Sequence, residues 1–303
     1  MNFQANQLTK SFGEKHVLKN VSLQAESGKA VGLLGRNGAG KTTTIRIIMG
    51  VFPPDSGSVL MDGKPIQREK INIGYLPEER GLYPKKIIFD QLLYLAELRG
   101  MSVKDAKASI EHWLNRLEMS EYIGKKLDTL SKGNQQKIQL AATLLSNPDF
   151  VILDEPFSGL DPVNAMMLKD IVKELISQGK IVLFSSHQMN YVEEFCDSIA
   201  ILNQGEIVLS GDIKQIKHSY DRSRMVIAAP QLTNIKAFCD EKLGDILTET
   251  AVEDDILKVK MKSPELKNAL ISALAGQNFD IDGVHVYEPS LNDIFVEYTE
   301  DAI

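Results

Sequence analysis

The sequence contains little cysteine and no long apolar run. Its 303 residues include two cysteines, Cys196 and Cys239. These are too few for a disulfide framework and lack the spacing of a metal-binding motif, so both are expected to be inert interior thiols. No segment approaches the ~18 consecutive apolar residues of a membrane-spanning helix. The start, Met1–Asn6, lacks the basic region and apolar stretch of an export signal. These absences predict a cytoplasmic chain that does not itself cross a bilayer.

The chain also lacks a basic surface excess, since its net charge is −7. Residues 1–218 hold 26 Lys and Arg against 25 Asp and Glu, whereas residues 219–303 hold 8 against 16. Recognition of nucleic acid normally requires clustered basic residues, so no nucleic-acid partner is expected. Because the length exceeds the ~100–200 residues of a typical domain, this asymmetry predicts two domains, 1–218 and 219–303.

The most informative segment that is present is a glycine-rich loop. Residues 35–42 read Gly-Arg-Asn-Gly-Ala-Gly-Lys-Thr and fit the pattern G-x-x-x-x-G-K-[ST]. An apolar run typical of a buried strand, Ala30–Leu34, precedes the loop, and a segment that can be helical follows it. Backbone N–H groups and the positive end of the helix bind nucleotide phosphates in this context, with Lys41 on the terminal phosphates and Thr42 on magnesium. The residues expected to bind the nucleotide here are Gly35, Asn37, Gly38, Ala39, Gly40, Lys41, Thr42 and Thr43.

A second apolar segment ends in two carboxylates. Phe150–Leu153 is followed by Asp154 and Glu155, and then by a proline that stops the strand. Such a pair alone is typical of a solvated strand end. With the phosphate loop upstream, however, both carboxylates are expected at the same carboxyl edge of a parallel sheet. Asp154 is then predicted to assist magnesium, and Glu155 to polarise the water that attacks the γ-phosphate.

Between these motifs, residues 130–137 read Leu-Ser-Lys-Gly-Asn-Gln-Gln-Lys and resemble the Leu-Ser-Gly-Gly-Gln signature of ATP-binding-cassette (ABC) ATPases. Leu130, Ser131 and Gly133 match, while the third and fifth positions depart from the signature in a way similar to an exporter-associated subgroup. The resemblance implies an α/β P-loop NTPase fold with a helical subdomain at about residues 82–147. It also implies that Ser131 and Gly133 contact the γ-phosphate of an ATP held by a second subunit.

The same resemblance implies roles for further positions. Phe12 matches the aromatic residue that stacks on adenine. His187, at the end of another apolar segment, matches a histidine that contacts the γ-phosphate, so the catalytic set is Glu155, His187 and Lys41. Asp161 ends a loop, residues 158–161, that is similar to the one communicating between paired subunits.

One departure from the family pattern concerns the metal. Glu78 stands where a magnesium-contacting glutamine is usual. Its carboxylate keeps an oxygen ligand but adds negative charge near the phosphates. Either the metal screens this charge, or the loop engages in only one state of the cycle.

Two amphipathic segments, at about residues 89–96 and 103–117, predict a compact helical insert. Sustained heptads are absent, which argues against the chromosome-structuring relatives of the family. The resemblance implies that this insert contacts a membrane partner, with the surface around Leu82–Pro84 as the docking groove.

The last part of the chain has a pattern of its own. Residues 224–287 predict the order βαββαβ, a ferredoxin-like accessory α+β domain, followed by a short helix. Glu288–Phe295 resembles the end of cassettes that serve sodium-extrusion and drug-export systems. No catalytic constellation is visible there, so dimer support or regulation is expected.

One phosphate loop and one signature in the chain imply pairing, with a second copy or with a paralogue. The predicted function is that of an ATP-binding and ATP-hydrolysing exporter subunit. It would use ATP and Mg²⁺ and drive a separate permease from the inner face of the cell membrane.

The alternative is a soluble ABC ATPase acting on a ribosome or nucleic-acid complex, although such relatives usually fuse two cassettes with a basic linker. A GTPase is less favoured, because the guanine-reading Asn-Lys-x-Asp motif is absent.

Overall fold

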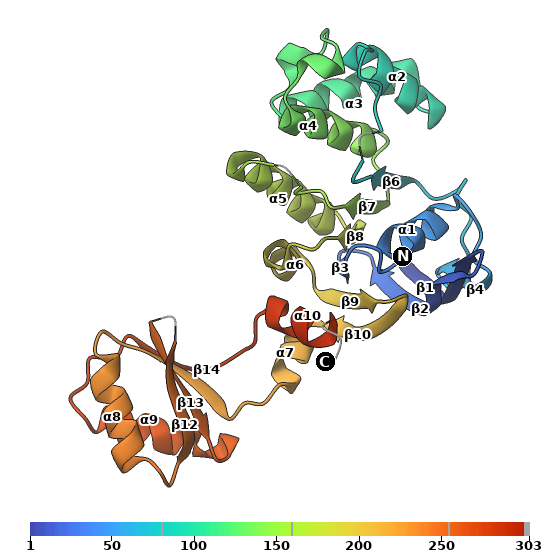
Figure 1. Ribbon diagram of the computed structural model, residues 1–303. Helices are drawn as coiled ribbons and strands as arrows, with labels where there is room; N and C mark the ends of the chain where they lie inside the picture. Colours follow the sequence, from blue (N-terminus) through green and yellow to red (C-terminus); the bar gives the residue numbers. More distant parts are fainter. Residues whose placement is uncertain (80, 159, 254, 300–303) are drawn as a thin grey trace. The chain divides into compact units, whose positions relative to one another are not determined.

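A computed structural model describes residues 1–79, 81–158, 160–253 and 255–299 (Figure 1). The chain divides into two compact units. Of the described residues, the larger unit comprises Met1–Ile213 together with residues 295–299, and the smaller comprises Lys214–Ile294. Each unit has its own hydrophobic core. In the described part of the chain, no helix combines the length and apolar character that crossing a bilayer requires.

The larger unit is built on a six-stranded sheet. In spatial order its strands are β10 (Glu206–Asp212), β9 (Ser198–Asn203), β3 (Ala30–Leu34), β8 (Ile181–Ser185), β7 (Phe150–Asp154) and β6 (Ile73–Leu76). All pairs are parallel except β9 with β10. Strands β3, β7 and β8 are buried at every position, which explains why their sequences are apolar throughout rather than alternating.

A second, antiparallel sheet completes the core of this unit. Its order is β2 (Lys15–Glu26), β1 (Asn2–Phe12), β4 (Ser56–Met61) and β5 (Lys64–Pro65). Apolar side chains of β1, α1 (Lys41–Met49) and the central strands pack into one cluster. Helix α1 ends at Gly50, whose φ of 75° is the left-handed conformation common after helices.

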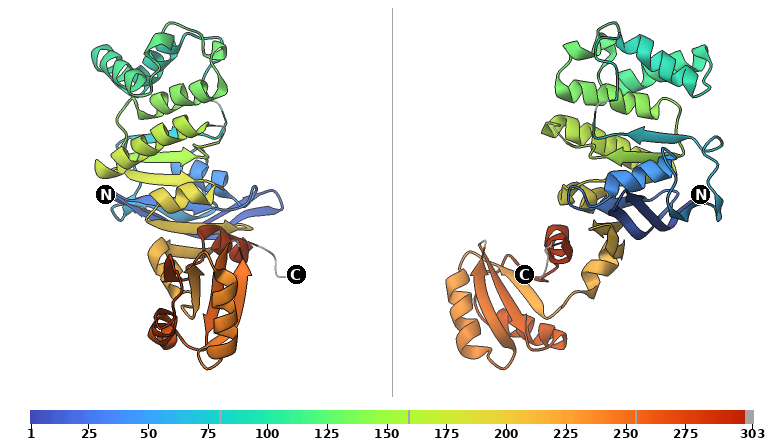
Figure 2. Two further views of the ribbon diagram at one scale, coloured as in Figure 1. Left: turned by 90° about the vertical axis from the view of Figure 1, so that its left-hand side faces the viewer. Right: turned by 45° about the vertical axis from the view of Figure 1, so that its right-hand side comes forward.

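Helices α2 (Ile88–Leu98), α3 (Val103–Arg116) and α4 (Lys132–Leu144) pack against one another as a helical insert beyond β6 (Figures 1 and 2). Short 3₁₀ turns at Ser120–Tyr122 and Leu127–Thr129 connect α3 to α4. Helices α5 (Pro162–Ser177) and α6 (Met189–Phe195) follow β7 and β8. Helix α4 starts at Ser131, whose hydroxyl accepts from the Asn134 amide at 3.3 Å, a helix cap expected of serine.

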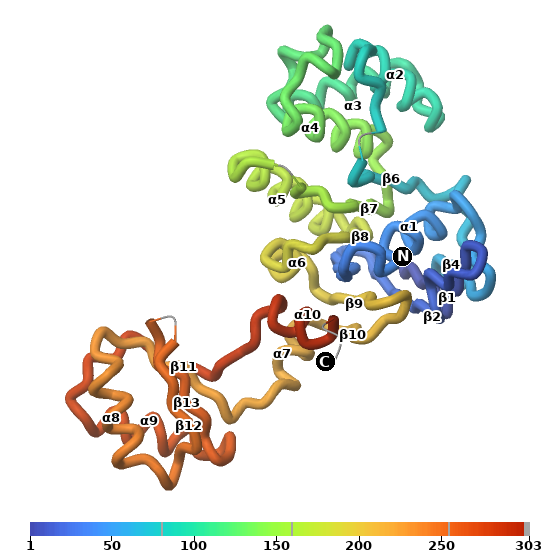
Figure 3. Tube along the Cα trace, in the orientation of Figure 1, coloured from blue at the N-terminus to red at the C-terminus, as the bar shows by residue number. Residues whose placement is uncertain are grey.

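The smaller unit has a four-stranded antiparallel sheet in the order β12-β13-β11-β14, and its chain path can be followed in Figure 3. Alternate residues of its central strands and one side of each helix form the core. This is the predicted βαββαβ arrangement with a ferredoxin-like strand order. Its elements are β11 (Arg224–Ala228), α8 (Leu232–Lys242), β12 (Leu247–Glu253), β13 (Ile256–Met261), a 3₁₀ turn (Pro264–Leu266), α9 (Lys267–Ala275) and β14 (Gly283–Val286).

The division of the chain at residues 218 and 219 stays a prediction. The two compact units differ from it in two places, because the smaller unit begins at Lys214 within α7 (Ile213–Ser219) and the second half of α10 (Leu291–Thr299) belongs to the larger unit. There the Asn203 side-chain amide donates to the Tyr298 carbonyl at 3.3 Å.

The end of α1 depends on one half-buried side chain. The Arg68 guanidinium donates to the Ile48 carbonyl at 2.8 Å, one of the last carbonyls of the helix, and to the Ile47 carbonyl at 3.0 Å, which also accepts from the Gly50 amide. We expect Arg68→Met to destabilise the larger unit by about 1–3 kcal/mol, because the Ile48 carbonyl loses its side-chain donor. Thermal unfolding measures the effect. Exposed Lys64, changed to Met, is the control and should unfold like the unaltered chain. Equal melting of both variants would contradict this role.

Candidate active site

The site lies at the carboxyl edge of the parallel sheet. Strand β8 pairs with β3 on one side and with β7 on the other, so the segments that follow these three strands meet there. A cavity of about 530 Å³ opens at this edge. Its lining residues are Phe12, Lys15, Val17, Arg36, Asn37, Gly38, Gly40, Lys41, Thr42, Thr43, Glu78 and Asp154.

The loop before α1 is shaped by glycines. At Gly35 a Cβ would lie 2.4 Å from the Leu202 carbonyl oxygen. At Gly40, whose φ is 116°, it would lie 2.6 Å from Leu18 Cδ2. Neither site has room for a side chain, and a φ of 116° is one that other residues rarely adopt. The loop therefore exposes backbone to the cavity. Gly35 and Ala39 are themselves buried beneath its surface.

Lys41 supplies positive charge from within this loop. The residue is 7% exposed, and its Nζ donates to the Gly35 carbonyl at 2.7 Å. Because Lys41 is also the first residue of α1, the ammonium and the positive end of the helix dipole act at the same place. Lys15 and Arg36 add two further cationic side chains to the lining. This side of the cavity suits a polyanion such as a chain of phosphates.

The same lining also contains acidic side chains. Asp154 is buried, and the Tyr75 hydroxyl donates to its Oδ2 at 3.3 Å. Burial raises the pKa of Asp154 because the charged form is poorly solvated there. Glu78 lines the same cavity from an exposed position, and half-buried Thr42 contributes a hydroxyl.

These oxygens fit a magnesium ion that is shared with a phosphate. Among the residues that the structure describes, no cluster of three His, Cys, Asp or Glu side chains could hold a metal alone. Mg²⁺ commonly takes one or two carboxylates and completes its shell with water and substrate phosphates. Thr42, Glu78 and Asp154 offer that kind of incomplete donor set.

Glu155 follows β7 in an unusual conformation. Its φ is 50°, a left-handed value rarely adopted by glutamate, and the residue is 4% exposed. Its Oε2 accepts from the Ser186 hydroxyl (3.2 Å) and the His187 amide (3.4 Å), and Nδ1 of His187 lies 2.9 Å away. Its Oε1 is buried and has no hydrogen-bond partner in the described chain. One oxygen is thus fixed by the segment after β8 while the other remains able to accept a proton or orient a water molecule.

The aromatic residue at the rim is Phe12. It is 50% exposed and packs edge-on against Phe52, with ring centroids 5.5 Å apart. An exposed aromatic face at a cavity mouth can stack on a planar base.

Besides Gly35, Ala39, Glu155 and His187, three further predicted residues lie outside this cavity lining. Ser131 begins α4, and Asp161 begins α5 by accepting from the Asn164 amide at 2.9 Å, which lowers the pKa of Asp161. The Asn164 side chain also donates to Asp161 and lies 3.4 Å from where a Cβ of Gly133 would be. Gly133 and Asp161 therefore both lie beside the Asn164 side chain. Gly159, in the same predicted loop as Asp161, lies outside the described residues.

The structure adds Lys15, Val17 and Arg36 as lining residues and Tyr75 as the partner of Asp154, none of which was predicted from the sequence. Arg36 occupies a variable position of the motif. A hint for Lys15 and Val17 was their place directly after Phe12, where the chain reverses from β1 into β2.

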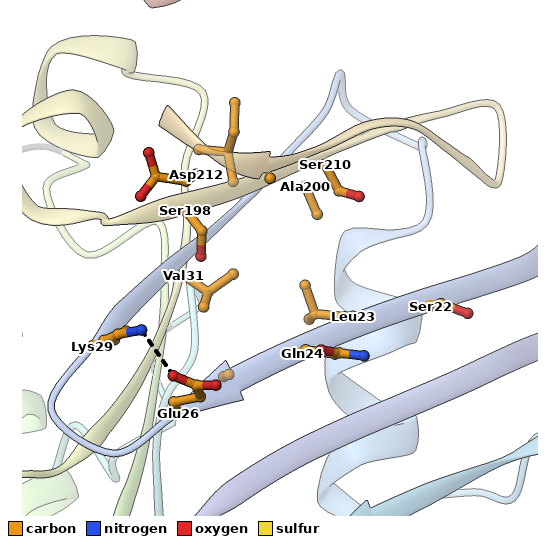
Figure 4. Close-up of a pocket in the computed structure, with 13 residues that line it drawn as sticks. Ser22, Leu23, Gln24, Glu26, Lys29, Val31, Ser198, Ala200, Ser210 and Asp212 are labelled. Atoms are coloured by element: carbon orange, nitrogen blue, oxygen red, sulfur yellow. Dashed lines mark hydrogen bonds and ion pairs between the residues drawn. The ribbon is translucent and has the colours of Figure 1, made fainter. Parts of the chain in front are cut away.

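A separate cavity of about 460 Å³ lies between β2 and the β9–β10 edge (Figure 4). The Glu26 carboxylate and the Lys29 ammonium pair there at 2.8 Å, and Asp212 lines the same cavity. This cavity contains none of the predicted site residues, and no group in it is arranged for catalysis.

Fold and site together define a P-loop nucleotide-binding protein. Residues 18–158 match a family profile described as "ABC transporter", and residues 211–299 match one described as "ATP-binding protein DrrA1-3-like, C-terminal domain". The chain is 42% identical over 292 residues to the Bacillus subtilis protein named "Uncharacterized ABC transporter ATP-binding protein YhaQ", covering 96% of each chain. It belongs to the ABC transporter ATP-binding proteins.

Two further comparisons agree with this membership. "Linearmycin resistance ATP-binding protein LnrL" of Bacillus subtilis is 30% identical and is covered over 97% of its length, with 98% of this chain aligned. A structure described as "Structure of ATP binding subunit of ABC transporter" superposes with a TM-score of 0.67 at 28% identity, covering 72% of this chain and 92% of that one.

The comparisons confirm the predicted family, the ABC ATPase fold and the function of an ATP-binding subunit that hydrolyses ATP to power transport. No finding favours the alternative of a ribosome-acting or nucleic-acid-acting ATPase. The roles of individual residues stay predictions.

The glycine loop can be tested by Gly40→Ala. Strain at a positive φ costs of order 1–3 kcal/mol, so we expect ATP affinity to fall about 10-fold or more. Binding of a fluorescent ATP analogue measures the loss. Gly124→Ala is the matched control, because Gly124 has open space where a side chain would go and no positive φ. Unchanged affinity in Gly40→Ala would show that the loop tolerates a side chain.

Proposed function

We propose that the cavity at the sheet edge binds ATP with Mg²⁺. The phosphates lie in the loop of residues 35–42, Lys41 holds the terminal ones, and Phe12 stacks on adenine. Thr42, Glu78 and Asp154 hold the metal, which neutralises phosphate charge when bound. This assignment is supported by the common lining that these residues form and by the glycines that leave no room for side chains.

We further propose that Glu155 orients the attacking water and that His187 holds Glu155 in position and contacts the γ-phosphate. The observation that carries this proposal is the asymmetry of the Glu155 carboxylate. One oxygen has three polar neighbours from the segment after β8, whereas the other is buried without a partner in the described chain. A buried acceptor that is already oriented needs no rearrangement before it takes up a proton.

The active unit is proposed to be a pair of subunits, either two copies or this chain with a paralogue. Ser131, Gly133 and Asp161 do not line the cavity of their own chain, although they begin helices that can approach an anion. In a head-to-tail pair, these residues complete the nucleotide site of the partner subunit. ATP then favours the closed pair, and hydrolysis favours the open one.

The helical insert is proposed to dock a membrane-embedded permease. Several large apolar side chains are exposed on or beside α2, and such a cluster favours a protein interface. They are Tyr83, Ile87, Tyr94, Leu98 and Val103. The subunit would act at the cytoplasmic face of the membrane. Export is the favoured direction, because the relative LnrL is named for resistance to linearmycin.

Residues 219–303 are proposed as an accessory domain that supports the pair or regulates it. The match to a DrrA1-3-like C-terminal domain supports a separate evolutionary module. No catalytic constellation is found among its described residues.

Glu155→Gln tests the hydrolytic step. The amide cannot take up a proton, so the rate of ATP hydrolysis should fall about 100-fold or more while ATP binding remains. The variant should accumulate as an ATP-bound dimer in analytical ultracentrifugation. Exposed Glu69, changed to Gln, is the control and should turn over normally. A Glu155→Gln protein that stays monomeric at saturating ATP would rule out the paired mechanism.

Leu98→Asp tests the docking surface. Leu98 is 65% exposed, so the change should leave the fold and the ATPase rate of the isolated subunit intact while weakening membrane docking about tenfold. Co-sedimentation of the tagged chain with membranes of the producing cell measures docking. Val51→Asp alters a similarly exposed residue outside the insert and serves as the control. Equal co-sedimentation of the two variants would refute this surface.

A further inference from the structure

We propose that Gln139 is a positioning residue that sets Glu78 at the magnesium side of the cavity. This inference rests on the metal-binding role proposed above for Glu78. Gln139 lies on α4, outside the predicted motif residues, and is 6% exposed. Its side chain therefore acts inside the larger unit rather than on solvent or on a partner.

The contacts of Gln139 converge on the two residues beside Glu78. Its Nε2 donates to the Pro77 carbonyl at 3.2 Å and to the Glu79 carbonyl at 3.1 Å. One amide group thus uses both of its N–H bonds on the backbone that carries Glu78. Two hydrogen bonds from one rigid plane fix the direction of that backbone, and with it the direction in which the Glu78 side chain leaves it.

Helix α4 has a second polar contact with the segment that carries Glu78. One turn further along the helix, the buried Thr143 hydroxyl shares its proton between the Tyr75 carbonyl at 3.2 Å and the Gln139 carbonyl of its own helix at 2.9 Å. Tyr75 is the residue whose hydroxyl reaches Asp154. Helix α4 therefore contacts the carbonyls of residues 75, 77 and 79, along the segment that supplies both the partner of Asp154 and the side chain of Glu78.

The position of Gln139 along α4 has a mechanical consequence. Ser131, which is proposed to contact ATP of the partner subunit, caps the same helix eight residues earlier, or about 12 Å along the axis at ~1.5 Å per residue. A helix of this length moves as one body. When the nucleotide of the partner subunit displaces the first turn of α4, Gln139 transmits this movement to Glu78. The movement of α4 thereby couples the two nucleotide sites of the pair.

A matched control is present in the same insert. Gln91 on α2 is 4% exposed, accepts from the Tyr83 amide at 3.1 Å and donates to the Lys86 carbonyl at 3.5 Å. It supports the same connecting segment, but beyond Glu78. Removing either buried amide disturbs packing to a similar degree, whereas only Gln139 contacts the backbone beside Glu78.

The test uses the full-length protein and titrates Mg²⁺ at a fixed concentration of a non-hydrolysable ATP analogue, with nucleotide binding followed by fluorescence. Gln139→Met should raise the half-saturating Mg²⁺ concentration about fivefold or more, and Gln91→Met should change it less than twofold. Gln139→Glu keeps the side-chain shape but replaces the donor with an acceptor, so it should raise the requirement at least as much. Amide hydrogen exchange in the peptide containing Glu78 should accelerate in both Gln139 variants and not in Gln91→Met.

Glu78→Ala distinguishes the metal-binding role of Glu78 from the positioning role of Gln139. It should raise the Mg²⁺ requirement, and adding Gln139→Met should then raise it no further. If Glu78→Ala binds Mg²⁺ and nucleotide like the unaltered protein, the proposed metal role of Glu78 is wrong. If Glu78→Ala is impaired while both Gln139 variants behave normally, or Gln139→Met and Gln91→Met shift equally, the positioning role is wrong.

Discussion

The adjacency of three buried strands is the constraint on which the rest of the structure depends. Strands β3, β8 and β7 lie side by side and parallel, and every residue in them is buried. Their apolar side chains hold the sheet together through both of its faces. Polar residues can appear only where each strand leaves the sheet, so the phosphate loop, Glu155 and His187 gather at one edge although long stretches of chain separate them.

The helical insert is joined to that edge by polar contacts as well as apolar packing. Near the start of α4, Gln136 donates to the Pro156 carbonyl, directly after Glu155, and two turns into the helix Gln139 donates on either side of Glu78. Hydrogen bonds in a buried interface depend on direction more strongly than apolar contacts do. Helix α4 therefore forms directional contacts with both segments that carry Glu78 and Glu155.

Much of the fold and part of the site could be predicted from the sequence. The apolar runs predicted β3 at its observed bounds and β7 to within one residue at its end, because strands buried on both faces leave an uninterrupted hydrophobic signal. Predicted residues such as Phe12, Lys41 and Glu78 line one cavity. Lys15 and Val17 could not be found in this way, since no motif marks residues that line a cavity only because β2 folds back beside the phosphate loop.

The sequence by itself determined the family, because the motifs that identify it are short runs of neighbouring residues. It also determined the phosphate loop and the helix starts at Ser131 and Asp161, because these depend on interactions within a few neighbouring residues. Tertiary structure decided the left-handed conformation of Glu155 and the partners of Gln139. It also decided that one side-chain oxygen of Glu155 is buried without a hydrogen-bond partner among the described residues. Gln139 lies about 60 residues from the carbonyls that it contacts. Such contacts depend on the packing of α4 against the segment that follows β6, and no local pattern in the chain encodes that packing.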